Sequence, residues 1–178
     1  ETLAQTIFKE WFVNFNYPDA TGEMVDSELG DIPKGWRVGK LGDVVNIKGG
    51  GTPSTKNETY WNGDIHWTSP KDLSNSKSAF LLDTEKKITK FGLQKISSGL
   101  LPKDTLLLSS RAPIGYLAIS DVNIAINQGY IALLNDSYLS NYYMFLWLKI
   151  NMKSVTNAAN GSTFLEISKT AFKGIDCI

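Results

Sequence analysis

The chain has 178 residues, of which 42% are hydrophobic and 11% aromatic, and this is enough apolar material for one buried core. Its 18 basic and 18 acidic side chains balance, but residues 1–30 hold one basic and six acidic side chains, so residues 31–178 are mildly basic. On charge alone, this small excess of basic side chains favours an ordinary solvated surface over a nucleic-acid-binding surface. The sequence lacks a signal-peptide pattern, a run of about 18 apolar residues that could span a membrane, and enough cysteine and histidine for a disulfide or a zinc site. We therefore expect one cytoplasmic domain with an appendage, cut from a longer protein because it begins with Glu1 rather than Met.

The first 16 residues are predicted to form an amphipathic helix, because their apolar side chains recur at spacings of three and four. Pro18 and a second Pro/Gly break between Gly30 and Trp36 set this helix apart, so residues 17–35 are expected to be a linker. We expect the helix to protrude from the domain and to pack on another helix or subunit, although packing on its own domain fits the pattern equally well. The candidate subunit-interface residues are Leu3, Ile7, Phe8, Trp11, Phe12 and Phe15.

From residue 36 the pattern changes to short strand-like pieces that are separated by Gly, Pro, Asn and Asp. These pieces cover residues 36–48, 64–69, 105–110, 116–120 and 123–134. A short helix is predicted near residues 90–96, a core helix that is apolar all round within residues 140–155, and a last short element around residues 164–172. The strands are too irregularly spaced for alternating βαβ units, so we predict a mixed α/β (α+β) fold. It would be a loop-rich twisted β-sheet domain with packed helices over residues 36–178.

Three patterns that could carry catalysis are incomplete. The glycines before Thr52 do not open a phosphate-binding P-loop, because Thr55 replaces its second glycine and Asn57 its hydroxyl residue. In "PDATGEMV" the lysine of a metal-dependent nuclease is replaced by Val25. His66 could serve a hydrolase together with a serine, but its strand-forming neighbours favour a packed histidine, and the sequence offers no third triad member. We therefore predict a chain without catalytic activity, metal or bound cofactor.

Five polar segments follow or interrupt the predicted strands: "GGGTPSTKN", "WTSPKDLS", "LSSRAPIG", "AINQGY" and "AANGST". They supply Ser, Thr, Asn, Gln, Lys and Arg, the side chains that hydrogen-bond phosphates and base edges. Arg111 is one of two arginines and the only one in such a segment, and Asn127 and Gln128 could each present an amide donor and acceptor to adenine. Each segment alone is typical of an ordinary turn, but five together favour a recognition surface.

Taken together, these segments resemble a target-recognition domain of the specificity subunit of a Type I restriction-modification system. The stretches "GDIPKGWRVGKLGDVVNIKGGGTPS", "GDIHWTSPKDL", "LLSSRAPIGYLAI", "AINQGYIAL" and "NGSTFLEISKTAFKGI" occur in that family's order and cover nearly all of residues 29–175. The leader "LAQTIFKEWFVNF" is similar to the end of the conserved spacer helix that precedes such a domain.

The resemblance implies a non-enzymatic reader of double-stranded DNA. Family subunits carry two recognition domains on two long helices, and each domain reads one half of a split target. Methyltransferase subunits and restriction subunits dock on them, and the methyl donor, ATP and Mg²⁺ are expected to bind those partner subunits. This chain has one recognition domain and part of one helix, so self-association through the N-terminal helix is a further expectation. The alternative is a protein–protein scaffold domain within a multi-subunit complex, without direct base reading.

The resemblance also leads to a set of candidate DNA-binding residues. We expect Gly49–Gly51 to let the chain leave a strand sharply and approach a surface closely, so that the following polar side chains lie there. We rank Thr52 and Pro53 below the residues that follow them, because a signature shared by domains with different targets is largely structural. The candidates are Lys56, Asn57, Tyr60, Trp61, Lys71, Ser110, Arg111, Asn127, Gln128, Asn160 and Ser162.

Overall fold

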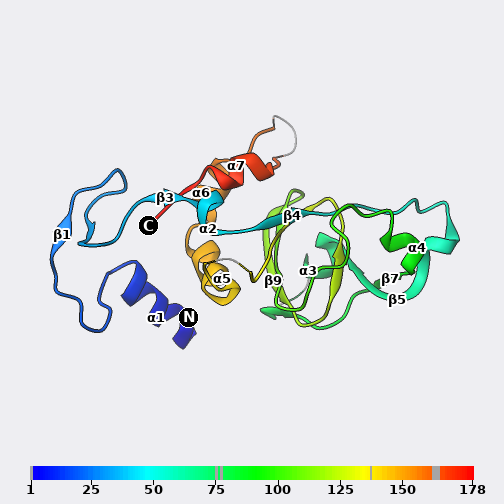
Figure 1. Cartoon of the computed structure of the whole chain (residues 1–178), viewed down its shortest axis with the longest axis horizontal. Coiled ribbons are helices and arrows are strands. Elements are labelled where there is room, and N and C mark those ends of the chain that lie inside the picture. Colours follow the sequence, from blue (N-terminus) through cyan, green and yellow to red (C-terminus); the bar gives the residue numbers. More distant parts are fainter. Residues whose placement is uncertain (1, 75, 77, 137, 162–164) are drawn as a thin grey trace.

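The computed structural model describes residues 2–74, 76, 78–136, 138–161 and 165–178. The molecule is elongated: the five-stranded and three-stranded β-sheets lie toward one end, helices α5, α6 and α7 lie in the middle, and helix α1 lies with the linker at the other end (Figure 1). This mixed arrangement of helices and sheets confirms the predicted fold class. The described part of the chain contains no helix long and apolar enough to cross a membrane.

A five-stranded sheet forms the centre of the domain, with the strand order β4-β11-β8-β9-β6. Its strands are β4 (Ile47–Gly49), β11 (Tyr130–Leu133), β8 (Leu106–Ser110), β9 (Ile114–Ser120) and β6 (Phe80–Leu81). Leu106 and Leu108 pack in the core that contains α5, whereas Leu107 packs on the opposite face with Ile124 and Ile126. The central strand β8 is therefore buried on both faces, which explains why "LLL" shows no polar alternation.

A second, three-stranded sheet lies at the far end, with the order β10-β5-β7. Its strands are β10 (Ile124–Ile126), β5 (Trp61–Thr68) and β7 (Lys86–Ile88), and the helical turns η1 (Glu58–Tyr60) and α4 (Lys90–Leu93) pack beside them. Trp67, Ile88 and Ile96 form a small core there. This end is thus a separate hydrophobic cluster that is joined to the central sheet through β10.

The helices partly follow the predicted pattern. Residues 140–155 form two helices, α5 (Asn141–Ile150) and α6 (Met152–Asn157), instead of one, because the chain leaves helical geometry at Asn151. Met144 and Leu148 of α5 are fully buried, as predicted for a core helix. Two further short helices are α3 (Pro70–Ser74) and α7 (Lys169–Lys173).

The expected strand over residues 36–48 is wrong in its middle, where a one-turn helix, α2 (Leu41–Val44), replaces it. This helix starts directly after β3 (Gly39–Lys40), which pairs with β12 (Asp176–Cys177) at the other end of the chain. The backbone N–H of Leu41 donates to the carbonyl oxygen of Ile175, and the Leu41 side chain is buried. Contacts more than 130 residues away in sequence therefore override the local strand pattern.

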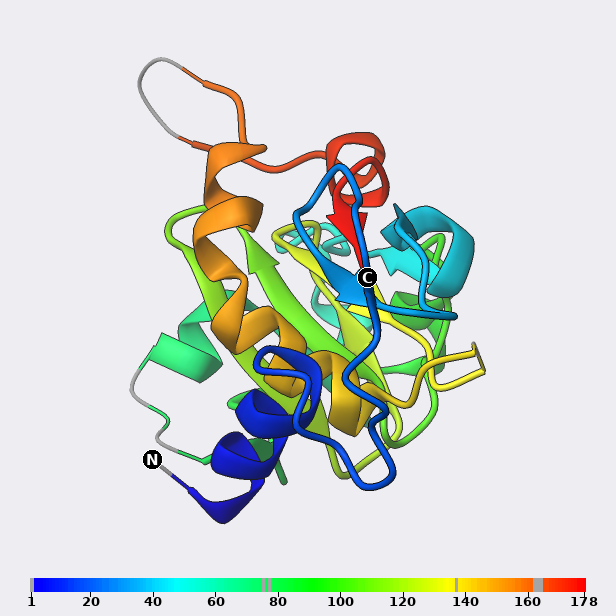
Figure 2. The same cartoon turned by 90° about the vertical axis from the view of Figure 1, so that its left-hand side faces the viewer.

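The N-terminal helix α1 (Leu3–Phe12) does not protrude freely, so that prediction is wrong. Phe8 is 3% exposed, and the rings of Phe8 and Phe12 each lie 5.0 Å from the ring of Tyr143 in α5. Figure 2 shows α1 alongside α5. The six apolar positions form one wide stripe: the flank with Phe8 and Phe12 is covered by the domain, whereas Leu3, at 76% exposure, and Trp11 lie on the open flank.

The linker is also ordered against the domain. Its short strands β1 (Met24–Val25) and β2 (Ile32–Pro33) pair with each other. The ring of Trp36 stacks on Tyr17 at 5.5 Å and meets Phe15 edge-on at 5.6 Å. Aromatic contacts therefore join α1, the linker and α5 into one packed unit.

Candidate nucleic-acid interface

The polar segments that are far apart in sequence lie next to one another in the structure. We call residues 49–57, 67–74, 108–115, 125–130 and 158–161 the loop cluster. Figure 1 shows the cyan segment after β4 and the orange segment before α7 along the same side of the molecule. Hydrogen bonds and close backbone contacts connect each segment of the loop cluster to the next.

The glycine-rich segment lies on the backbone of residues 125–130. The N–H of Gly51 donates to the carbonyl oxygen of Ile126 at 2.9 Å, and the hydroxyl of Thr52 donates to Oε1 of Gln128 at 2.6 Å. A Cβ atom at Gly50 would lie 2.1 Å from the carbonyl oxygen of Ile126, so only glycine fits. The close approach that was expected of the three glycines is therefore present at Gly50. The surface that they approach is the protein's own backbone.

Residues 125–130 in turn contact the segment that leads into α3. The backbone N–H of Asn127 donates to the carbonyl oxygen of Thr68 at 2.9 Å, and Oδ1 of Asn127 accepts from the N–H of Gly129 at 2.8 Å. The hydroxyls of Tyr130 and Thr68 lie 3.3 Å apart, and burial raises the pKa of Tyr130. The amide oxygen of Asn127 is therefore occupied inside the protein, which leaves its amide nitrogen for an external partner.

The turn between β8 and β9 joins the C-terminal segment to the cluster. The N–H of Ser110 donates to the carbonyl oxygen of Gly129 at 2.8 Å, and the carbonyl oxygen of Ser110 accepts from Ile167 at 3.0 Å. Asn160 and Glu166 exchange backbone hydrogen bonds of 2.9 and 3.0 Å. All five polar segments thus form one connected surface, which single segments of sequence could not reveal.

The predicted DNA-binding residues differ in how far they can reach a partner. Exposed side chains are Lys56, Lys71, Gln128 and Asn160. Half-buried side chains are Asn57, Tyr60, Trp61, Arg111 and Asn127. Ser110 is 3% exposed, and Ser162 lies outside the described residues. Of the described candidates, Ser110 is therefore the one least able to touch a ligand.

Two of the cationic candidates are paired with carboxylates at the surface. Nζ of Lys71 lies 3.0 Å from Oε2 of Glu85, and Nη1 of Arg111 lies 3.6 Å from Oε2 of Glu166. Exposed ion pairs of this kind contribute about 0–1 kcal/mol to stability, because water and salt screen them. Either cation could therefore exchange its carboxylate for a phosphate at little cost.

Two tryptophans hold the glycine-rich segment on the three-stranded sheet. Nε1 of Trp61 donates to the carbonyl oxygen of Ser54, and Nε1 of Trp67 donates to that of Gly51, each at 3.1 Å. The two indole rings meet edge-on, with centroids 5.1 Å apart. The indole N–H of Trp61 is therefore used to position the segment.

Sequence reasoning missed two lysines that lie over the aromatic candidates. Nζ of Lys86 is 5.7 Å from the ring centroid of Trp61, and Nζ of Lys95 is 5.8 Å from that of Tyr60. Both distances are typical of a cation–π contact. Lys86 and Lys95 lie outside the polar segments and about 25 to 35 residues from their rings, so no local pattern points to them.

His66, the one histidine, contacts Asp83 and Thr84 rather than a serine. Its Nδ1 lies 3.2 Å from Oδ1 of Asp83 and 3.4 Å from the hydroxyl of Thr84. Among the described residues, no serine forms a hydrogen bond with this ring. The geometry thus gives the hydrolase hypothesis no support. Throughout the residues that the structure describes, no group of three or more His, Cys, Asp or Glu side chains could hold a metal ion.

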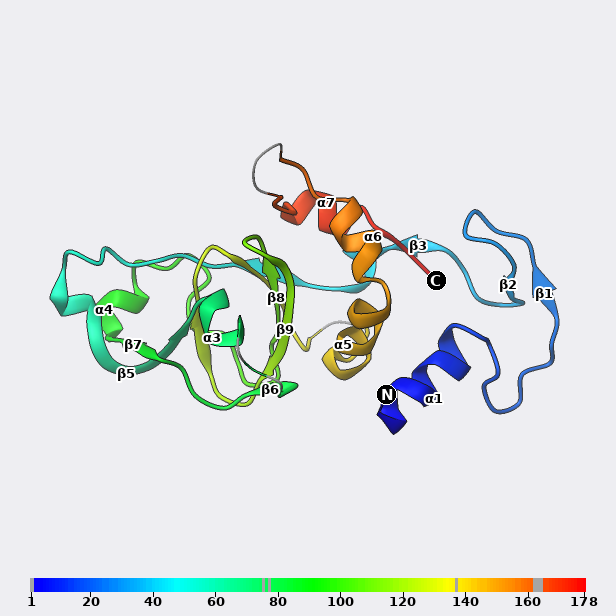
Figure 3. The same ribbon diagram turned by 180° about the vertical axis from the view of Figure 1, so that it is seen from behind.

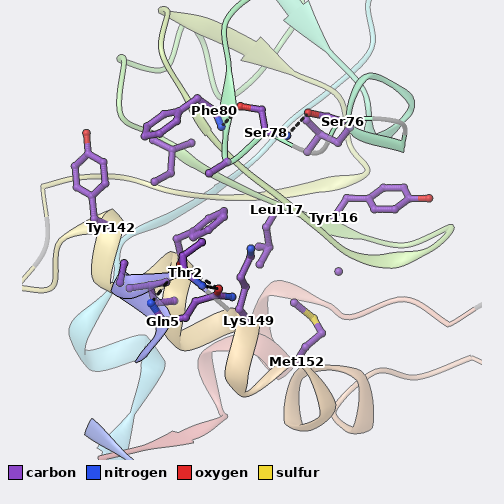
Figure 4. A pocket seen from close by; sticks show the side chains of 17 residues that line it. Thr2, Gln5, Ser76, Ser78, Phe80, Tyr116, Leu117, Tyr142, Lys149 and Met152 are labelled. Atoms are coloured by element: carbon purple, nitrogen blue, oxygen red, sulfur yellow. Dashed lines mark hydrogen bonds between the residues drawn. The ribbon is translucent and has the colours of Figure 1, made fainter. Parts of the chain in front are cut away.

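One groove lies away from the loop cluster for the most part. It has a volume of about 720 Å³ and is bordered by α1, α5 and the sheet edge of β9 and β6, as Figure 4 shows. Lys149 is the one charged side chain among its lining residues, and its ammonium group lies 4.8 Å from the ring centroid of Phe145. The described lining therefore offers no acid–base pair for catalysis.

Comparisons with known proteins agree on one protein family. The family model described as Type I restriction modification DNA specificity domain matches residues 33–176. The chain is 38% identical over 156 residues to the Type I restriction enzyme MjaIX specificity subunit of Methanocaldococcus jannaschii, and the match covers 86% of this chain and 36% of that protein. It is 30% identical over 148 residues to the Type I restriction enzyme EcoprrI specificity subunit of Escherichia coli, covering 75% of this chain and 34% of that protein.

Solved structures share the fold. The crystal structure of the HsdS subunit from Thermoanaerobacter tengcongensis superposes with a TM-score of 0.64 at 21% identity and covers 98% of this chain and 37% of that one. A structure concerned with complex assembly and conformational transition of the type I R-M system gives a TM-score of 0.65 at 23% identity, with coverage of 98% and 38%. At these identities the likeness concerns the fold alone. The chain spans about a third of the length of the relatives that it matches.

Proposed function

Because the chain belongs to the family of Type I restriction modification DNA specificity domains, we propose that it recognises one half of a split target in duplex DNA. In this proposal it is a sequence-reading part of a restriction-modification complex and performs no chemistry itself. The methyltransferase subunits modify the DNA and bind the methyl donor, and the restriction subunit uses ATP and Mg²⁺. The chain positions both kinds of subunit on the target.

The observation that carries the proposal is the connected loop cluster. Base edges are read by hydrogen-bonding side chains that a rigid scaffold presents together. Here the polar segments of five different connections are fixed to one another by backbone hydrogen bonds, as in the chain of contacts from Gly51 through Ile126 and Gly129 to Ser110. Ordinary turns that only connect strands have no need of such mutual support.

The open flank of α1 supports a second role in assembly. Leu3, Ile7 and Trp11 recur every four residues and are exposed, whereas Phe8 and Phe12 on the adjacent flank pack on Tyr143. Exposed apolar stripes of this kind mark protein contacts. We propose that this flank binds another helix of the complex, including a second copy of this chain, so that reading and assembly use opposite ends of the molecule.

Arg111 offers the most direct test of base reading. Its planar guanidinium can bind guanine or a phosphate in a bidentate manner, and the ion pair with Glu166 keeps it at the surface of the loop cluster. In the assembled complex, Arg111→Ala should weaken DNA binding by about 1–3 kcal/mol and relax the preference at one base pair. Titration of labelled duplexes that differ at single positions measures both effects.

The matched control is Glu166→Gln, which removes the opposing carboxylate and keeps the side-chain shape. It should leave DNA affinity unchanged or raise it, since the guanidinium loses a competitor. An equal loss for every duplex in Arg111→Ala would assign Arg111 to a phosphate. Unchanged affinity would assign it to the internal ion pair alone and would count against base reading by this side chain.

A further inference from the structure

The far end of the molecule carries four lysines that have no carboxylate within ion-pairing distance among the described residues. We call Lys56, Lys86, Lys90 and Lys95 the lysine tip. Of the other basic side chains in the described chain, Lys34, Lys40, Lys71, Lys103, Arg111 and, beside the tip in β7, Lys87 form ion pairs. No ion pair joins Lys9, Arg37, Lys48, Lys149, Lys153, Lys169 or Lys173 to another described residue, but these lie in other parts of the fold. The unpaired acidic side chains on the neighbouring elements are Glu58 of η1 and Asp64 of β5. Positive charge therefore exceeds negative charge at the tip.

Aromatic rings hold two of these lysines without neutralising them. Lys86 lies over the ring of Trp61, and Lys95 lies over the ring of Tyr60. Tyr60 and Trp61 are adjacent in the sequence. A cation–π contact restricts the long side chain but leaves the ammonium charge intact. The ammonium groups of Lys86 and Lys95 are thus held beside two adjacent aromatic residues, and both can still bind an anion.

The backbone beneath the lysine tip is closely packed. A Cβ atom at Gly63 would lie 2.4 Å from the carbonyl oxygen of Ile88, and one at Gly92 would lie 2.4 Å from that of Tyr60. The N–H of Thr89 donates to the carbonyl oxygen of Tyr60 at 3.0 Å. The elements beside the lysines, η1, β5, β7 and α4, are therefore closely packed on one another.

The lysine tip continues directly from the loop cluster. Lys56 belongs to the glycine-rich segment, and Trp61, which carries Lys86, donates its indole N–H to Ser54 in that segment. A hollow of about 550 Å³ lies between Thr55, Trp61 and residues 84–87. Figures 1 and 3 show β5, β7 and α4 at the extreme end of the molecule, opposite α1.

We propose that the lysine tip binds phosphates of the DNA backbone beside the bases that the loop cluster faces. The inference rests on the proposed function and adds the division of labour within the site. Phosphates attract unpaired cations and release counterions on binding, whereas base edges are neutral hydrogen-bonding partners. Tyr60 and Trp61 are then positioning residues for Lys95 and Lys86, and they do not read bases.

The test replaces all four tip lysines by glutamine in the full chain and measures affinity for a short labelled duplex over a range of salt concentrations. Log affinity falls as log salt concentration rises, and each phosphate contact makes this slope steeper by about 0.9. Loss of four contacts should therefore reduce the magnitude of the slope by about 3 to 4 and should weaken binding to all duplex sequences alike. The same variant in the assembled complex should keep its base preference.

The matched control changes the same number of charges away from the tip: Lys9→Gln, Lys34→Gln, Lys40→Gln and Lys103→Gln. Thermal melting checks that both proteins are folded. The control should keep the salt slope of the unmodified chain. An equal fall of the slope in both variants would show a general charge effect and overturn the inference, as would a tip variant that loses preference at one base pair. If the unmodified chain and the assembled complex fail to bind DNA at low salt, the proposed function itself fails.

Discussion

Thr52 and Gln128, which are 76 positions apart in the sequence, are joined by a hydrogen bond of 2.6 Å between Oγ1 and Oε1. Both side chains are exposed in the loop cluster. Because the amide oxygen of Gln128 accepts from Thr52, its amide nitrogen is directed by that bond and keeps its two donors for an external acceptor. The contact therefore orients a side chain that suits the recognition of adenine or guanine edges.

Replacement of Gln128 by alanine should relax the sequence preference of the assembled complex at one base pair, by about 1–3 kcal/mol of discrimination. Thr52→Val removes the orienting hydroxyl and should produce a smaller loss at the same base pair. The stability of the fold should change by less than about 1 kcal/mol in either variant, since both groups are exposed to water. Binding to a panel of single-base variants of the target measures the preference.

Gln94→Ala serves as the control for the loss of an exposed glutamine outside the loop cluster. It should leave the preference intact. A Gln128→Ala protein with an unchanged preference at every position would remove Gln128 from the list of base-reading residues.

Gly50 should not tolerate alanine, because a Cβ atom there would overlap the backbone carbonyl groups of Ile126 and Asn127 at 2.1 and 2.3 Å. The segment must shift, and we expect a loss of about 1–3 kcal/mol of stability. Gly39→Ala is the matched control, since no atom lies within 4 Å of its Cβ position. Urea unfolding of both variants measures the difference, and equal stability would contradict the close backbone approach.

Local patterns in the sequence were sufficient for the buried elements and for the identity of the polar segments. The run Leu106–Leu108 and the apolar helix α5 gave strong signals because burial on both sides leaves few polar residues. The glycine-rich segment was expected to approach a surface, and Gly50 does so at Ile126. The signals for these features come from residues that are close together in the chain, although the backbone that Gly50 approaches lies far away in sequence.

Features that depend on distant residues could not be predicted. The one-turn helix α2 is held by Ile175 near the other end of the chain, and the pairing of Lys86 with Trp61 requires the strands β5 and β7 to meet. For α1 the sequence showed an apolar stripe but not which flank would be covered. Tyr143, the residue that covers it, lies more than 130 positions from Phe8.

The two flanks of α1 should respond differently to substitution. Phe8→Ala removes a buried ring that contacts Tyr143 and should cost about 3–5 kcal/mol of stability. The double variant Ile7→Ser, Trp11→Ser changes the open flank, so it should alter the stability far less and should reduce association with partner helices. Thermal melting and sedimentation at high concentration separate the two effects. If the unmodified chain stays fully monomeric at high concentration when no partner subunit is present, self-association through this flank is contradicted.

The chain alone should bind DNA weakly and with little sequence preference. Residues 31–178 hold 17 basic and 12 acidic side chains, and six acidic side chains precede them, so few phosphates can be neutralised. At physiological salt its dissociation constant should lie near or above the range of about 10⁻⁴–10⁻⁶ M that is typical of non-specific binding. One half of a split target also supplies only part of the specific binding energy.

In titrations of labelled duplex at moderate salt, affinity should rise by orders of magnitude when methyltransferase subunits and a second recognition half are added, because these supply the missing contacts to the DNA. Tight and sequence-specific binding by the isolated chain would overturn this division of labour.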